Sequence, residues 1–452
     1  MADRFKTVDR DTQYLFPPSV QDWLPKNHLA RFVVELVDEI DLEKLNASYR
    51  ACGSLAFHPS MMVALLFYGY ATGIFSSRKL ERATHDSVAF RYIAANTYPD
   101  HDTIASFRRR FMKELKPIFS HILEVAHTMR VLKLGTVSLD GTKVKANANK
   151  HKALSYGYAE RLEAQLKKEV AKLMELAESA DQNEKPDGMD IPSELERRET
   201  RLDAIAKAKE EIEKRSKERH DREQGKYESK CAKRQAKADE TGKKPRGPVP
   251  KPPESGPKNR DQVNLTDEDS RIMPGSGKSF NQSYNAQAVV DVETMLVVAN
   301  TVSQNANDKK ELEPILECLE DLPDSLGNAQ KLLADAGYFS ETNVAACERK
   351  HITPYIASGR ESHNKTLEER FEQEPPAPDT TGSVAKMKYR LKTREGKALY
   401  AKRKSTVEPV FGIIKQVMGF RQFFLRGLTA VEDEWNLVCM AWNIRRLHAL
   451  KA

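Results

Sequence analysis

Residues 331–338 read KLLADAGY and predict a short buried strand that ends at an acidic residue. Three apolar residues precede Asp335, and Gly337 supplies the turn chemistry that stops the strand. Open α/β sheets place their ligands beyond the carboxyl ends of the strands, which makes Asp335 a candidate site residue. The plainer alternative is an Asp that serves only the turn, which is the commoner role of Asp in such a setting.

A second stretch of this kind, VLKLGTVSLDGTKVKANA, occupies residues 131–148. Alternating apolar residues up to Leu139 predict a strand that leads to Asp140. Gly141 and the threonine after it predict a tight turn, followed by a second extended stretch. Both aspartates are then expected at strand ends on one rim of the same sheet, although Asp140 alone also fits a turn.

The surrounding patterns alternate between strands and helices. Strands are predicted before and after a hairpin turn at 291–294, and TPYIAS at 353–358 predicts another. Amphipathic helices are predicted near 308–322 and 340–350, then near 396–418 and 430–448, with an irregular polar excursion over 358–395. The order strand, strand, strand, helix, strand, helix, strand indicates a mixed α/β core.

Residues 17–130 predict helices, one of them opened by Pro59. A later predicted helix places Ile104, Phe107 and Phe111 on one face and also carries Arg108, Arg109 and Arg110. Three adjacent arginines cover more than half of a helix's circumference, so some of them must face solvent, where a DNA backbone could meet them. An ordinary solvated helix face is the favoured alternative.

Residues 150–230 are strongly charged and predict a long antiparallel helical hairpin. Its apolar positions repeat every three or four residues, and a stretch at 187–193 breaks the pattern. Residues 242–257 hold six prolines and predict a linker. The expected domains are therefore 1–130, helical; 131–150 with 270–452, mixed α/β; and 151–269, a charged helical insertion.

The composition favours a polyanionic partner only mildly. Lys and Arg number 73 against 66 Asp and Glu, a formal charge of +7 with a pI near 8.9. The five scattered cysteines form no metal-ligand or redox pair, which fits a reducing compartment. The N-terminus lacks the apolar run of a signal peptide and no membrane span is expected, so we expect a cytoplasmic protein.

A third acid, Glu408, lies in the helical stretch RKSTVEPVFGIIK at 403–415. Val407, Phe411 and Ile414 supply a packing face that would fix this helix against the sheet and direct the carboxylate towards the two aspartates. Three carboxylates from separate elements suit Mg²⁺, which prefers oxygen ligands. Two such cations can activate an attacking oxygen and stabilise a leaving oxygen in phosphoryl transfer.

These residues resemble those of a known family. SLDGTKVKANA (138–148), NQSYNAQAVVD (281–291), LLADAGYFS (332–340) and YAKRKSTVEPVFGIIKQVMGFRQFFLRG (400–427) are similar to segments of DDE transposases from bacterial insertion sequences. The stretch from Pro18 to Phe111 resembles the helical domain that precedes the catalytic core in one branch of that group. Together these segments cover most of the chain outside the charged insertion.

The resemblance implies an RNase H-like mixed sheet preceded by an all-α domain. It implies that Asp140, Asp335 and Glu408 form the catalytic triad and hold Mg²⁺ or Mn²⁺, two ions per active site. The implied function is cleavage at insertion-sequence ends and strand transfer into target DNA. The implied partners are double-stranded DNA, both the terminal inverted repeats and the target, and a second copy of the chain on that DNA. The implied location is the cytoplasm, with association with the nucleoid when the protein is bound to DNA.

The family also has a Tyr-Arg-Glu-Lys signature around its last acid, which the resemblance assigns here to Tyr400, Arg403, Glu408 and Lys415 for DNA contact. Four residues separate Arg403 from Glu408, where the family usually has three. Lys404 is therefore an alternative to the arginine.

Arg421 lies within an aromatic group of Phe420, Phe423 and Phe424. These rings could stack on exposed DNA bases beside the arginine, but packing in the core is favoured.

Two other functions stay open at this stage. One is an RNase H-like nuclease without joining activity, since the same three acids serve hydrolysis alone. The other is a catalytically inactive DNA-binding protein whose acids are turn residues.

Overall fold

The computed structural model of the chain describes residues 19–49, 56–180, 190–242, 247–275, 279–359, 376 and 382–451. The described residues fall into two compact units, one drawn from 1–144 and 284–452 and the other from 145–283. No helix in these ranges combines the length and the apolar character needed to cross a membrane.

The first unit opens with a helical region. Three of its helices begin with a side chain that replaces a missing backbone partner: His28, His58 and Asp100 each accept a hydrogen bond from a backbone N–H in the first turn. Pro59 starts its helix as predicted, and that helix is buried on nearly every side. The helices are α1 (Val20–Trp23), α2 (Leu29–Asp38), α3 (Glu43–Ala47), α4 (Pro59–Ala71), α5 (Ser77–Asp86), α6 (Val88–Ile93), α7 (His101–Phe111) and α8 (Ile118–Thr128).

A mixed sheet follows, which confirms the predicted α/β class. The sheet has six strands: β4 (Arg271–Pro274), β5, β1, β7 and β8 are neighbours in that order, and β6 also pairs with β5. The pair β5/β6 is antiparallel, whereas β1/β7 and β7/β8 are parallel. The elements are β1 (Thr136–Lys145), β5 (Phe280–Asp291), β6 (Val297–Ser303), α11 (Leu312–Glu320), β7 (Lys331–Ala334), α12 (Glu341–Arg349) and β8 (Thr353–Ile356). Their order along the chain is the predicted one.

Strand β1 corrects the expected strand, turn and strand of residues 131–148. It continues without a break from Thr136 to Lys145, so Asp140 and Gly141 lie in its middle. Gly141 was interpreted as a turn residue, but in the structure its lack of a side chain leaves room for the side chains of Gln287 and Asp308. A Cβ there would lie 2.9 Å from Oδ1 of Asp308 and closer still to Gln287.

The C-terminal third is more helical than predicted. The irregular excursion expected over 358–395 is wrong for α14 (Ser383–Lys392), whose Met387 is fully buried; residues 360–375 and 377–381 lie outside the described ranges. The remaining elements are α15 (Arg394–Ala401), a 3₁₀ turn η7 (Lys402–Ser405), α16 (Val407–Gly412), a π-helical turn η8 (Ile413–Val417) and α17 (Leu428–Lys451).

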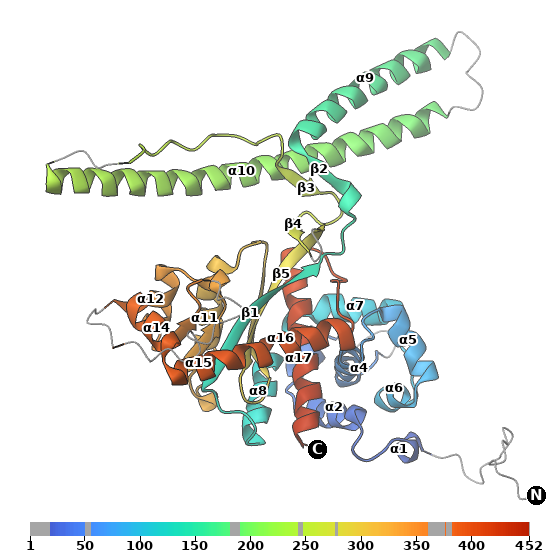
Figure 1. Cartoon of the computed structure of the whole chain (residues 1–452). Coiled ribbons are helices and arrows are strands. Elements are labelled where there is room, and N and C mark those ends of the chain that lie inside the picture. The colour runs from blue at the N-terminus through green and yellow to red at the C-terminus, as the bar shows by residue number, and fades with distance from the viewer. Residues whose placement is uncertain are drawn as a thin grey trace, which may run out of the picture. The chain divides into compact units, whose positions relative to one another are not determined.

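Helix α17 lies between the sheet and the N-terminal helices (Figure 1). On the sheet side, Nε1 of Trp435 donates to the carbonyl of Gln287 at 3.0 Å, and Asn443 bonds both backbone groups of Val297. On the helical side, the buried Glu434 accepts from the Tyr70 hydroxyl at 3.0 Å. One helix thus joins the N-terminal helices to the sheet.

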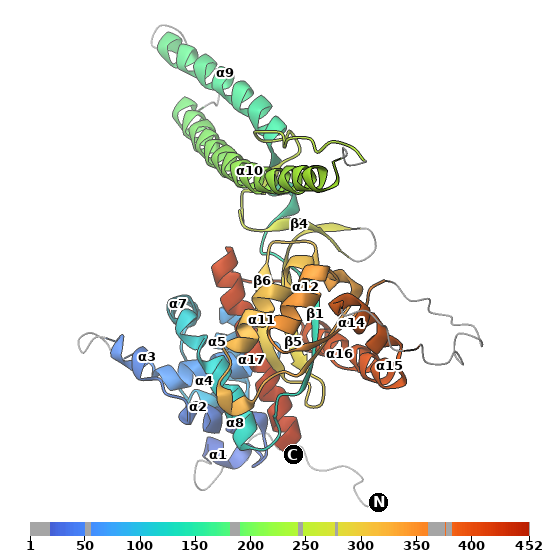
Figure 2. The same ribbon diagram turned by 90° about the vertical axis from the view of Figure 1, so that its left-hand side faces the viewer.

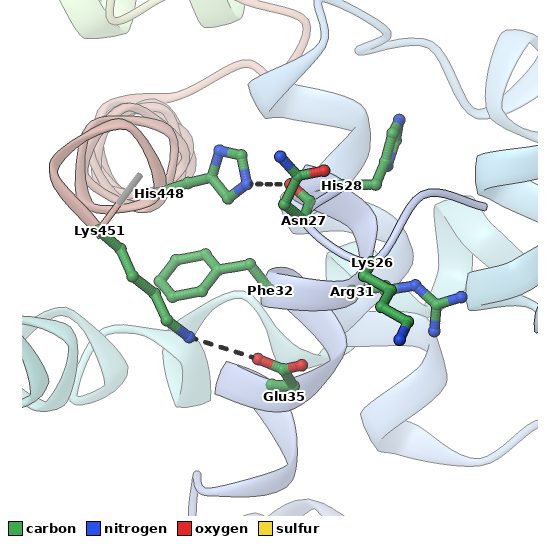
Figure 3. A pocket seen from close by; sticks show the side chains of 8 residues that line it. All are labelled: Lys26, Asn27, His28, Arg31, Phe32, Glu35, His448 and Lys451. Carbon is green, nitrogen blue, oxygen red and sulfur yellow. Dashed lines mark hydrogen bonds and ion pairs between the residues drawn. The ribbon is translucent and has the colours of Figure 1, made fainter.

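The end of α17 also meets α2, around a small hollow shown in Figure 3. There Nε2 of His448 lies 2.8 Å from the carbonyl oxygen of Asn27, and Lys451 lies 3.7 Å from Glu35. The Lys451 ammonium also sits 5.3 Å from the centre of the Phe32 ring. These contacts anchor the last helical turn to the N-terminal helices.

The second unit is the predicted long helical insertion. Helix α9 (Tyr156–Ala180) packs along the first half of α10 (Ile191–Thr241), while the second half of α10 continues beyond α9 (Figures 1 and 2). Leu166, Ile205 and Ile212 form its core, which confirms the predicted apolar spacing. The short strands are β2 (Ala153–Ser155), β3 (Gln262–Asn264) and β4 (Arg271–Pro274).

Candidate active site

Two aspartates follow paired positions on adjacent parallel strands. In the β1/β7 register Leu139 stands opposite Ala334, and the next residues are Asp140 and Asp335. The carboxylate of Asp335 caps the 3₁₀ turn η6 (Ala336–Tyr338), because its Oδ1 accepts from the Gly337 N–H at 2.8 Å. Asp335 therefore does serve a turn, and its neighbour across the strands is the other predicted acid.

The environment of Asp140 is unfavourable to its charged form. Burial raises the pKa of Asp140 to about 6, and the charges of Asp335 and Glu408 act in the same direction. The backbone N–H of Gly141, at 2.8 Å, and the Arg403 guanidinium oppose this rise. The three predicted acids are thus close enough to influence one another, with one arginine as the counterion.

Arg403 links the first acid to the third. Its Nη1 lies 3.3 Å from Oδ2 of Asp140, and its Nη2 lies 3.1 Å from Oε1 of Glu408. The arginine side chain is only 12% exposed, whereas that of Glu408 is 49% exposed. Nε of Arg403 is buried and bonds no other group in the described part of the chain. One monovalent cation thus holds two carboxylates together.

The structure accommodates the four residues that separate Arg403 from Glu408, one more than is usual in the Tyr-Arg-Glu-Lys signature. The 3₁₀ turn η7 carries Arg403 into the site, and Lys404 beside it is exposed. The extra residue between Arg403 and Glu408 is accommodated because η7 and α16 are separate turns that meet at the buried Thr406. The arginine, not the lysine, contacts the acids.

A fourth acid, Asp308, borders the same site and was not predicted. Its Oδ1 accepts from Lys143 at 3.2 Å, from the Asn285 amide at 2.7 Å and from the Gln287 amide at 3.0 Å. Asp308 starts the 3₁₀ turn η4 (Asp308–Lys310) after a polar loop, where nothing in the sequence marks it as more than a cap.

Two glycines allow these acids to approach the backbone closely. A Cβ at Gly337 would lie 2.9 Å from Oδ1 of Asp335 and 3.6 Å from Oδ2 of Asp308. At Gly141 the added Cβ would press on Oδ1 of Asp308. The Asp308 carboxylate therefore spans the space between the segments that follow the two predicted aspartates.

The other signature residues also reach this region. The Tyr400 hydroxyl donates to the carbonyl of Ala334 at 3.3 Å, directly before Asp335. Nζ of Lys415 donates to the carbonyl of Lys143 at 3.0 Å and to the Thr142 hydroxyl. Lys415 lies in the π-helical turn η8, so the regular α-helical path expected between Glu408 and this lysine is wrong. Such turns are frequent at functional sites.

The predicted DNA-contacting arginines divide into buried and accessible ones. Arg108 corrects the expectation, because its side chain is buried and donates to the carbonyl of Phe75 at 2.9 Å and to the Tyr70 hydroxyl. Arg109 and Arg110 are exposed, although Arg110 donates to the carbonyl of Ser48 at 2.6 Å.

Arg421 is exposed and bonds to the carbonyl of Lys415 at 3.1 Å and to the Gln416 side chain. Among the neighbouring aromatic side chains, Phe420 and Phe423 are buried, so the prediction of core packing is confirmed for both. Phe424 is 41% exposed.

The donor set suits a hard divalent cation, since it consists of carboxylate oxygens around a position that already accepts a cation, the Arg403 guanidinium. Within the described ranges, however, no three His, Cys, Asp or Glu side chains are gathered closely enough to hold a metal ion. The acids surround the arginine and do not form a ready-made pocket for a metal.

Comparison with known families adds two matches. Residues 18–110 match the family model described as "Transposase domain (DUF772)", and residues 248–444 match the one described as "Transposase DDE domain". The second range includes Asp335, Arg403 and Glu408, whereas Asp140 lies between the two ranges. No curated protein and no solved structure matches the chain significantly.

Proposed function

The chain belongs to the DDE transposases of insertion sequences, and we propose that it cleaves DNA at the ends of such an element and joins them to target DNA. The observation that carries the proposal is that Arg403 bridges two acids from distant parts of the sequence, one of which follows the strand position paired with the residue before Asp335. Asp140 and Asp335 follow paired strand positions, and Arg403 ties Glu408 to Asp140.

The fold supports the proposal. We infer that the mixed sheet is that of an RNase H-like core, with Asp335 directly after β7, Asp140 on the adjacent β1 and Glu408 on α16. On this basis residues 131–150 and 270–452 are the catalytic domain, residues 151–269 are an insertion into it, and the helices of 1–130 bind terminal repeats and support dimer formation on DNA.

In the proposed reaction Asp140, Asp335 and Glu408 hold two divalent cations, Mg²⁺ or Mn²⁺. When bound, such ions activate the attacking oxygen and stabilise the leaving oxygen of a phosphodiester. The chain's own contribution is to fix the carboxylates on separate rigid elements, which keeps the ligand oxygens in place.

The basic residues at the site are suited to the DNA backbone. Lys415 reaches the segment directly after Asp140, where its ammonium can meet a phosphate beside the acids. We propose that Arg403 turns from the carboxylates to a phosphate when DNA arrives, and that Tyr400, Lys404 and Arg421 line the same path. Arg109 and Arg110 remain candidate DNA contacts of the N-terminal helices.

Asp140→Asn tests the enzymatic part of this proposal. The substitution keeps the size of the side chain and removes a carboxylate charge, so DNA binding in a gel-shift assay should persist. Cleavage of a duplex that carries the element's end should fall by about a hundredfold to a thousandfold, by analogy with the loss of a group that stabilises transition-state charge. Full cleavage by this variant would exclude Asp140 as a metal ligand.

A precut end separates transposition from simple hydrolysis. Wild-type protein supplied with a 3′-hydroxyl end and a plasmid target should produce joined products. Cleavage of uncut ends without any joining would instead identify a nuclease of the same fold.

A further inference from the structure

The second half of α10 carries a row of basic side chains along one face. Arg222, Lys226, Lys230, Lys233 and Lys237 are spaced by four, four, three and four residues. On a helix with 3.6 residues per turn, these positions fall within about 80° of one another. All five side chains are exposed, and none makes an ion pair with any residue that the structure describes. We call these five residues the basic row.

Elsewhere in the helical hairpin, basic side chains form ion pairs with acidic side chains of the same helix. Lys167 pairs with Glu163 at 2.6 Å, and Arg215 pairs with Glu211 at 2.7 Å, each four residues apart. Opposite charges at this spacing stabilise a helix, whereas like charges destabilise it. Within the basic row, like charges stand at each of these spacings, so its members do not stabilise one another.

Acidic side chains such as Glu223 and Glu240 lie beside the row or just beyond its end, but none of them forms an ion pair with it in the part of the chain that the structure describes. Gln224 and Gln235 bond to Glu228 and Asp239 on other faces of the helix. A further face is covered from within the unit, because Arg234 donates to the carbonyls of Gly247 and Pro248. All five side chains of the basic row stay exposed, although Lys226 and Lys230 also line a hollow between α10 and residues 248–253.

We propose that the basic row binds the phosphate backbone of duplex DNA. The row spans about 22 Å at 1.5 Å per residue, and duplex DNA carries one phosphate charge per about 1.7 Å of its axis, so DNA offers more phosphates over this length than the row has side chains. The row contains no apolar residue, and the centres of protein–protein interfaces are poor in lysine, which disfavours a second copy of the hairpin as the partner. The contact is independent of base sequence, because it involves phosphates alone.

This proposal rests on the proposed function only in that the chain acts on DNA, and its test requires no catalysis. The full-length chain is compared with a variant in which all five residues of the basic row become Gln, a good helix former. A matched control removes five exposed lysines from other positions of the hairpin: Lys168, Lys172, Lys207, Lys214 and Lys217. Both variants lose the same charge.

The measurement is affinity for a random-sequence duplex without divalent metal, at salt concentrations from 50 to 200 mM. Each lost phosphate contact should reduce the slope of log affinity against log salt by about 0.9, so the basic-row variant should lose a slope of about 4 to 5 and the control less than about 1. Circular dichroism should show equal helix content in both variants.

Equal changes in the two variants would overturn the proposal, since net charge alone would then explain the binding. An unchanged slope in the basic-row variant would overturn it as well. A loss of self-association by that variant, with DNA affinity intact, would assign the row to a protein partner. Failure of cleavage with this binding intact would contradict the proposed function and not the role of the row.

Discussion

Arg403 and the side chains of the basic row on α10 are all positively charged, but Arg403 is buried and the row is exposed. The Arg403 guanidinium is 12% exposed and bridges Asp140 and Glu408, whereas the lysines of the row face water without an ion pair among the described residues. In the buried setting the Arg403 guanidinium has carboxylate partners, which fits the high cost of an unpaired buried charge. On the insertion an unpaired charge costs little, so it is free to meet DNA. Burial thus separates cations that are paired within the DNA-free chain, such as Arg403, from cations of the basic row that are not.

The largest expected effect is on a buried charge of the core. Glu434 is fully buried and accepts from the Tyr70 hydroxyl and from the backbone N–H groups of Phe424 and Leu425. Glu434→Ala leaves these donors and the nearby Arg108 without their anion. The free energy of unfolding in urea should fall by about 3–5 kcal/mol.

Glu432 provides the matched control. Glu432 lies on the same helix as Glu434 but at the surface, where it pairs with Lys116 at 3.4 Å. Glu432→Ala should therefore change the free energy of unfolding by about 1 kcal/mol or less. Equal effects of the two substitutions would break the distinction between buried and exposed charges.

A smaller loss is expected where the acids crowd a glycine. Gly141→Ala places a Cβ 2.9 Å from Oδ1 of Asp308 and against the Gln287 amide, so stability should fall by about 1–3 kcal/mol through overpacking. Gly135→Ala adds its Cβ to open space and should stay within about 0.5 kcal/mol of wild type. Thermal unfolding of both variants would measure the difference, and an unaffected Gly141→Ala variant would show that the site is looser than described.

The third prediction concerns metal binding by the DNA-free chain. Arg403 donates to two carboxylates that a divalent cation would use, so Arg403→Gln should raise the affinity for Mn²⁺ in calorimetry without DNA. Charged hydrogen bonds contribute about 1.5–3 kcal/mol, which corresponds to a tenfold or greater gain.

Lys404→Gln removes the same charge from the neighbouring exposed side chain and should leave Mn²⁺ affinity within about twofold, given the weakness of screened surface charges. A loss of affinity in Arg403→Gln would mean that the arginine positions the acids for metal and does not compete with it.

The smallest effect is a pH dependence. Burial raises the pKa of Glu434, against the opposing hydrogen bonds from Leu425 and Phe424 and the charge of Arg108. The folded chain therefore keeps this proton at pH values where the unfolded chain has lost it. The resulting stability is fully present below the ordinary Glu pKa of about 4.3 and is lost as pH rises through the folded value.

Glu434→Gln cannot titrate at this position. The stability of wild type relative to this variant should therefore decline as pH rises above about 4, by about 1.4 kcal/mol for each unit of pKa shift. A difference that does not change with pH would contradict a raised pKa.

The sequence was informative where local pattern and tertiary contacts agree. Apolar runs before Asp140 and Asp335 predicted strands, and the structure aligns both residues across one parallel pair. The packing face around Glu408 predicted its helix, and Val407, Phe411 and Ile414 are buried.

The sequence was less informative where a residue's partner is distant along the chain. Gly141 looked like a turn residue, because nothing nearby shows that Gln287 and Asp308 press against it. Arg108 could not be told apart from Arg109 and Arg110, since its partners lie on other helices. Asp308 was missed for the same reason.

The most direct test is a structure of the chain with a DNA end and Mn²⁺. Asp140, Asp335 and Glu408 should each place an oxygen about 2.0–2.3 Å from a metal ion, with the Arg403 guanidinium moved onto a phosphate. An ion held by Asp335 and Asp308, with Glu408 still paired to Arg403, would contradict the assignment of the three acids.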